Sequence, residues 1–102
     1  MNRSIIFRPA TRQDFLEACD WYDDQLAGLG ARFERAVERT LERIAAWPES
    51  YGIVHRDVRR ALVRPFPYGV FYRIRPDAIH VLAMLHGHRD QSIWKSRTEI
   101  ND

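Results

Sequence analysis

The order of apolar and polar residues in the first quarter of the chain predicts a short strand followed by an amphipathic helix. Residues 4–8 place apolar side chains on both faces of a strand, which Pro9 is expected to end. The apolar residues then recur every three or four positions, at Phe15, Ala18, Cys19, Tyr22 and Leu26. Thr11 is predicted to cap this helix, with Asp14 at the third helical position.

A second helix is predicted over residues 31–47, after a bend at Gly28-Leu29-Gly30. Its apolar stripe consists of Phe33, Ala36, Val37, Thr40, Leu41 and Ile44. Arginine and glutamate alternate over the opposite face, which we interpret as a solvated surface. Pro48 lacks the amide that a helix needs, so it is expected to close this one.

The second half of the chain contains three runs of β-branched, aliphatic and aromatic residues, at 59–64, 69–74 and 78–86. Two turn signals, Pro65-Phe66-Pro67 and Arg75-Pro76-Asp77, separate these runs and predict an antiparallel meander. Residues 49–58 are expected to form a connector. A helical hairpin returns the chain to the end of the sheet that it left, so the strands on either side of it are predicted to run in opposite directions.

These elements predict a single α+β domain over residues 1–102. It has an N-terminal strand, an α-helical hairpin and a three-stranded antiparallel meander, with the helices packed on one face of an antiparallel sheet. A chain of 102 residues that is 45% hydrophobic can bury one core. No secretory signal is visible, and the longest apolar run, residues 81–85, is far shorter than the ~18 residues of a membrane span. The lone Cys19 cannot form an internal disulfide, so a cytoplasmic protein is expected.

The last predicted strand, residues 78–86, is apolar on both faces. Strict alternation puts Ile79, Val81, Ala83 and Leu85 on one face, and His80, Leu82, Met84 and His86 on the other. One face is expected to meet the helices. The other needs a cover, either another polypeptide or a short helix in the tail that packs Ile93 and Trp94 onto the sheet.

Charge is distributed unevenly along the chain. Residues 1–54 hold seven arginines against nine acidic residues, a net charge of −2, whereas residues 55–102 hold nine basic groups against five acids, a net charge of +4. Fifteen of the sixteen basic residues are arginine, whose guanidinium group binds carboxylates and phosphates. An acidic protein and a nucleic acid are both plausible partners, although the excess is smaller than that of a dedicated DNA-binding protein.

Several residues of the meander are candidates for chemistry on a phosphodiester: Arg64, Tyr72, Arg73, His86, His88 and Arg89. Cleavage of RNA through its own 2′-hydroxyl needs a base, an acid and cations, and these residue types supply all three without a metal. The alternative is that Tyr72 is a half-buried strand aromatic, that His86 forms a strand-end hydrogen bond and that the arginines face a partner. We favour this alternative.

The sequence predicts neither a metal site nor a cofactor. His86 and His88 have the spacing of a zinc-chelating pair, but His80 lies roughly 20 Å from His86 along an extended strand, which is too far to share a metal. Cys19 has acidic neighbours, which would raise its pKa, so we interpret it as a buried structural thiol. The chain has no Ser-His-Asp order, glycine-rich phosphate loop or zinc-ribbon spacing.

Taken together, the order of elements and a set of short motifs resemble the ParE/RelE superfamily of type II toxins, most of all its ParE-like plasmid-stabilisation branch. The motifs are Trp21-Tyr22, Leu29-Gly30-x-x-Phe33, Pro48, Val58-Arg59, Phe66-Pro67-Tyr68, Tyr72-Arg73 and His86-x-x-Arg89-Asp90-x-x-x-Trp94-x-x-Arg97. Two departures from the family pattern are Gln91, where a proline often follows the Arg-Asp pair, and a single lysine, Lys95, where RelE-like enzymes carry several.

The resemblance implies a growth-inhibiting toxin that a cognate antitoxin holds inactive in a hetero-oligomer. In the ParE-like branch the implied action is inhibition of DNA gyrase by binding, without chemistry on the toxin. In the RelE-like branch it is cleavage of messenger RNA on the ribosome. The residues expected to contact a partner are Arg60, Arg64, Leu82, Met84, His86, Arg89 and Trp94.

Overall fold

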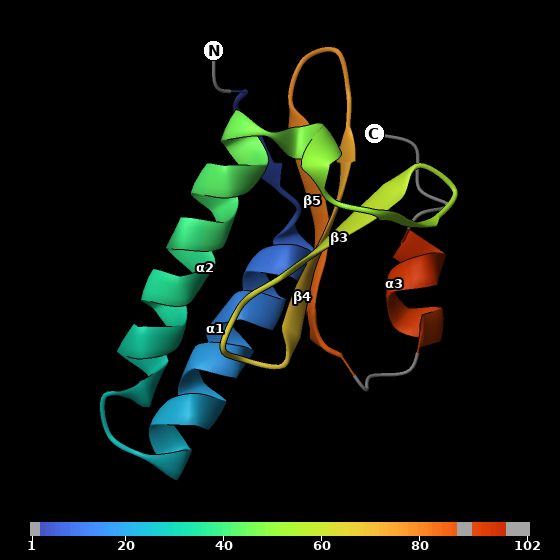
Figure 1. Ribbon diagram of the computed structural model, residues 1–102. Coiled ribbons are helices and arrows are strands. Elements are labelled where there is room, and N and C mark those ends of the chain that lie inside the picture. The colour runs from blue at the N-terminus through green and yellow to red at the C-terminus, as the bar shows by residue number, and fades with distance from the viewer. Residues whose placement is uncertain (1–2, 88–90, 98–102) are drawn as a thin grey trace.

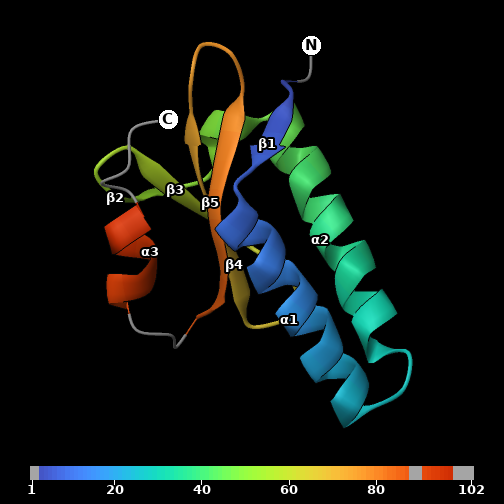
Figure 2. The same cartoon turned by 180° about the vertical axis from the view of Figure 1, so that it is seen from behind.

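The structure, a computed structural model, describes residues 3–87 and 91–97 and consists of a sheet covered on both faces (Figures 1 and 2). The strand order is β1-β5-β4-β3-β2. The hairpin of α1 and α2 packs on one face, and α3 packs on the other. In chain order the elements are β1 (Ile5–Phe7), α1 (Pro9–Gln25), α2 (Leu29–Ala46), the 3-10 turn η1 (Pro48–Ser50), β2 (Ile53–His55), β3 (Val58–Leu62), β4 (Tyr68–Ile74), β5 (Ile79–His86) and α3 (Gln91–Arg97).

The α+β architecture with a helical hairpin and a meander is confirmed, with small shifts at the ends of the elements. One local prediction was wrong, because α1 begins at Pro9 with Arg8 as its N-cap, and no side chain caps it. Proline suits the first turn of a helix, where its missing amide has no partner to lose. Thr11 is buried instead, and its hydroxyl donates a hydrogen bond to the Val81 carbonyl oxygen at 2.8 Å.

The prediction of a wholly antiparallel sheet was wrong, because β1 runs parallel to β5. The segment expected to be a connector contains β2, which pairs with β3 in antiparallel fashion. The strand predicted over 59–64, which is β3, was expected to run opposite to β1, and this expectation was wrong. The strand that follows the hairpin and runs opposite to β1 is β2. The additional turn between β2 and β3 then reverses the chain once more, so β3 and β5 have the direction of β1.

An irregularity in the pairing of β4 with β5 decides which face several predicted site residues occupy. Val81 and Ala83 pair with consecutive residues of β4, so Leu82 has no partner of its own in the register. Such a bulge shifts the alternation of side chains beyond it. Met84 therefore packs under the helical hairpin with Val81, whereas Leu82 and Ala83 pack under α3. The prediction that Leu82 and Met84 share a face was wrong.

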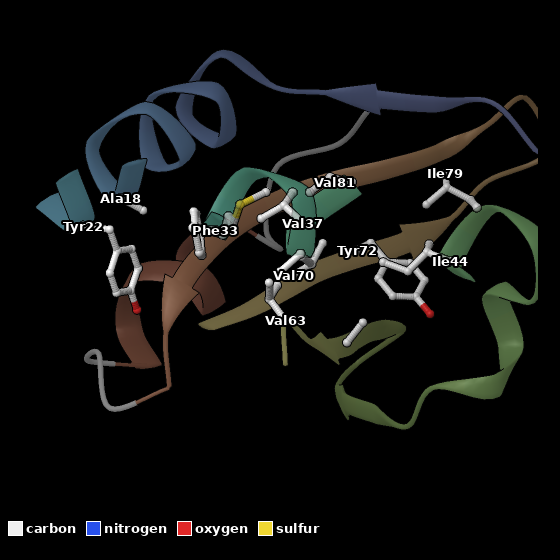
Figure 3. Close-up of a cluster of buried hydrophobic side chains, with 13 residues drawn as sticks. Ala18, Tyr22, Phe33, Val37, Ile44, Val63, Val70, Tyr72, Ile79 and Val81 are labelled. Atoms are coloured by element: carbon white, nitrogen blue, oxygen red, sulfur yellow. The ribbon is translucent and has the colours of Figure 1, made fainter. Parts of the chain in front are cut away.

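Two apolar clusters join the layers. Figure 3 shows buried side chains of the first, which lies between the helical hairpin and the sheet. In this cluster the centroid of the Phe33 ring lies 5.1 Å from that of Tyr22 and 5.2 Å from that of the partly buried Phe66. In the second, Trp94 of α3 stacks on Phe71 of β4 with the centroids 4.6 Å apart. The tail thus covers the second face of the sheet, as the sequence allowed. Each large apolar side chain buried here contributes about 1.5 to 3 kcal/mol.

Candidate functional site

Tyr72 and Arg73, two of the candidates for phosphodiester chemistry, are adjacent on β4 and point to opposite faces of the sheet. Tyr72 is fully buried under the helical hairpin, and its hydroxyl donates a hydrogen bond to the Pro48 carbonyl oxygen at 2.6 Å. Burial raises the pKa of Tyr72 to about 12, although the nearby Arg59 acts in the opposite direction. Arg73 is buried as well and forms an ion pair with Asp57 at 3.1 Å. The Tyr72 contact holds η1 against the sheet, and the Arg73 contact holds the turn between β2 and β3.

His86 and Arg64 line separate hollows. His86, at the end of β5, meets the Tyr68 ring edge-on with 5.6 Å between centroids. Its hollow, of about 400 Å³, is bounded by Asp14, Glu17, Ala18, Trp21, Tyr68, Met84 and Leu85. Arg64 follows β3 and faces a hollow of about 390 Å³, which is also bounded by Arg43, Tyr51, Arg60 and Leu62. The structure therefore does not bring these two side chains into one hollow, and His88 and Arg89 lie outside the described residues.

Three of the residues predicted to contact a partner are buried within the chain itself. Leu82 is fully buried, Met84 is 1% exposed and Trp94 is 6% exposed. By contrast, Arg60 and Arg64 are exposed. The Arg60 side chain lies across Gly69, where an added Cβ would come within 3.0 Å of the arginine Cγ. The exposed part of the predicted partner surface is thus its basic part.

Beyond β1, the edge of β5 forms hydrogen bonds with polar side chains of α1 and α3, and no pattern in the sequence connects these side chains with each other or with β5. β1 pairs only with the first residues of β5, so the backbone groups further along that edge need other partners. Asp14 of α1 accepts a hydrogen bond from the Met84 amide at 3.0 Å. Arg97 of α3 donates to the Leu82 carbonyl oxygen at 3.1 Å and forms an ion pair with Asp14 at 2.6 Å. These bonds tie α1 and α3 to the central strand.

Six exposed arginines line three neighbouring hollows, and we call this region the arginine surface. Its members are Arg32, Arg35, Arg39 and Arg43 of α2, with Arg60 and Arg64 on β3 and after it. One hollow, of about 450 Å³, lies between α2 and the turn after β3. A second, of about 510 Å³, lies along the end of α2, and the third is the hollow of Arg64. The first two hollows share Arg39, and the second and third share Arg43.

The part of the chain that the structure describes contains neither a membrane-spanning helix nor a metal-binding cluster. No helix there is long and apolar enough to span a membrane. The same residues contain no group of three or more histidine, cysteine, aspartate or glutamate side chains placed to hold a metal ion.

A protein family, a relative from Mycobacterium tuberculosis and a solved structure resemble this chain. The family described as "ParE toxin of type II toxin-antitoxin system, parDE" matches residues 5–91. Toxin ParE2 of Mycobacterium tuberculosis, in strains CDC 1551 / Oshkosh and H37Rv, is 28% identical over 88 residues, which cover 85% of this chain and 84% of the relative. A solved structure described as "Chromosomal ParDE TA system from P. aeruginosa" has the same fold, with a TM-score of 0.63 and 14% identity over 82% of this chain and 95% of that chain. Because the family match spans most of its length, this chain belongs to the ParE toxin family of type II toxin-antitoxin systems.

Proposed function

We propose that this chain stops growth by binding DNA gyrase, and that a cognate antitoxin binds the toxin and holds it inactive. Membership of the ParE toxin family supports a toxin, and gyrase is the target that the resemblance to ParE-like toxins implies. A partner antitoxin is supported by the structural relative, which comes from a ParDE toxin-antitoxin system. The proposed action is contact with the target rather than a reaction.

The observation that favours binding over RNA cleavage is the separation of Tyr72, Arg73 and His86 within the described part of the chain. Cleavage through the 2′-hydroxyl needs all three around one phosphate. The Tyr72 hydroxyl is bonded to a backbone oxygen beneath the helical hairpin, whereas Arg73 extends from the other face of β4 and pairs with Asp57. His86 faces a hollow whose other titratable groups are the carboxylates Asp14 and Glu17 and the phenol of Tyr68. This arrangement supports a toxin that recognises its target without cutting it.

Two assays on the purified chain test the proposal. In the first, gyrase, ATP and relaxed plasmid are mixed with increasing toxin, and we expect supercoiling to fall as toxin is added. In the second, the same toxin is added to a translating extract, and we expect transcripts to stay intact and protein synthesis to continue. Unimpaired supercoiling together with cut transcripts would overturn the proposal and support the RelE-like alternative.

A further inference from the structure

We propose that the arginine surface is the docking site for an acidic segment of the antitoxin, in which carboxylates alternate with apolar side chains. The inference rests on the proposed function for the identity of the partner. The surface itself indicates the chemistry of that partner, through the spacing of the arginines, the absence of partners for their guanidinium groups among the described residues, and the apolar groups between them.

The arginines of α2 form a continuous stripe. Positions 32, 35, 39 and 43 are separated by three, four and four residues, so their side chains share one side of the helix. At 1.5 Å of rise per residue the stripe is about 16 Å long, which matches about three turns of a partner helix. Arg60 and Arg64 extend it towards β3. Guanidinium groups bind carboxylates with two parallel hydrogen bonds, so this row suits a segment with repeated acidic residues.

None of the six guanidinium groups is used within the described part of the chain. No side-chain hydrogen bond or ion pair joins any of them to another described residue. Arg73 and Arg97 differ, because each forms an ion pair, with Asp57 and Asp14 respectively. The stripe thus gathers like charges that repel one another in the free protein, and carboxylates from a partner would relieve that repulsion.

Apolar and aromatic side chains lie between the arginines. The first hollow is bounded by Tyr22, Leu29, Pro65, Phe66 and Pro67, the second by Ala46 and Trp47, and the third by Tyr51 and Leu62. Trp47 is 68% exposed and Leu62 is 41% exposed. Arginine combined with large aromatic residues is typical of the energetic centre of protein interfaces. A partner segment is therefore expected to present apolar side chains to these hollows as well as carboxylates to the arginines.

The same surface fits a protein segment better than a nucleic acid. Glu42 lines the second hollow beside Arg39 and Arg43. A continuous row of phosphates would be repelled by this carboxylate, whereas a protein segment can place its acidic residues beside the arginines alone. The net charge of the whole chain is only +2.

The test measures the affinity of the cognate antitoxin for purified toxin variants. Arg39→Glu changes the arginine that two hollows share, and Arg64→Glu changes a different element, so one local folding defect cannot explain both. Arg12→Glu is the matched control, because Arg12 is exposed on α1 and lines a separate hollow. We expect each of the first two variants to bind the antitoxin about tenfold or more weakly than the unchanged toxin, and this loss of affinity should be larger at low salt. The affinity of the control should stay within about twofold of that of the unchanged toxin. Thermal unfolding checks that all three variants fold.

Several outcomes would overturn the inference. Binding of Arg39→Glu and Arg64→Glu as tight as that of the unchanged toxin would exclude the surface as the docking site. Normal antitoxin binding with lost gyrase inhibition would assign the surface to the target. Loss of affinity for a DNA duplex, with antitoxin binding intact, would assign it to nucleic acid. Toxin that binds its antitoxin through these arginines but leaves gyrase active would refute the proposed target and leave this inference standing.

Discussion

Replacement of Asp14 by alanine tests whether the edge of β5 is held as the structure indicates. The Asp14 side chain is only 9% exposed and accepts hydrogen bonds from the Met84 amide and from Arg97. Without it the Met84 amide loses its acceptor, which costs about 1 to 3 kcal/mol. Loss of the partly buried ion pair adds about 1 kcal/mol, because Arg97 keeps its bond to the Leu82 carbonyl and some contact with solvent. We therefore expect Asp14→Ala to lower the free energy of unfolding by about 3 kcal/mol.

Urea denaturation measures this loss, and hydrogen exchange at the Met84 amide locates it. Arg97→Gln is expected to cost about 1 kcal/mol, and the double variant to show a coupling of about 1 kcal/mol between the two residues. Glu17→Ala is the matched control, because Glu17 is exposed on the same helix and should change stability by about 0.5 kcal/mol or less. A loss below about 1 kcal/mol for Asp14→Ala, with unchanged exchange at Met84, would refute the reasoning.

Three further predictions concern packing and ionisation. Trp94→Ala removes the ring that stacks on Phe71, so urea denaturation should show a free energy of unfolding lower by about 3 to 5 kcal/mol. A decrease below about 1 kcal/mol would mean that α3 does not cover the sheet. Gly30→Ala would place a Cβ 2.6 Å from the Cys19 carbonyl oxygen, so thermal unfolding should show a loss of about 1 to 3 kcal/mol, and an unchanged midpoint would contradict this close approach. Burial, with smaller effects of Glu34 and other carboxylates, raises the pKa of the Cys19 thiol from 9.0 to about 11. Between these two pH values only the unfolded thiol ionises, so the free energy of unfolding should fall as the pH rises from about 9 to about 11. A thiol reagent at pH 8 should also react more slowly with folded than with unfolded protein. Equal reaction rates would contradict the raised pKa of Cys19.

The helices and most strands could be predicted because their signals are local. The stripe of α2 is buried at Phe33, Ala36, Val37, Thr40 and Ile44, as its spacing indicates. The strand β2 was missed because its turn has no glycine or asparagine signal, and Arg56 instead adopts a positive φ of 53°. That one short strand sets the direction of the remaining sheet relative to β1.

The candidate site was harder to predict, since it depends on contacts between distant segments. The bulge at Leu82 moved Met84 and His86 to the opposite face from His80, and nothing in the alternation of residues marks it. Asp14 and Arg97, which are 83 positions apart, meet only once the sheet has formed. The arginines of α2 were visible in the sequence as part of a solvated face, but their place beside Arg60 and Arg64 requires the fold.

The most direct test of a toxin that acts by contact is a supercoiling assay on the variant Tyr72→Phe. This protein lacks the phenol that cleavage of RNA could use, but keeps His86 and the exposed arginines. If binding alone stops gyrase, the concentration that halves supercoiling should match that of the unchanged toxin within about twofold, once the folded fraction of each protein is measured. A folded variant that no longer inhibits gyrase would contradict this account.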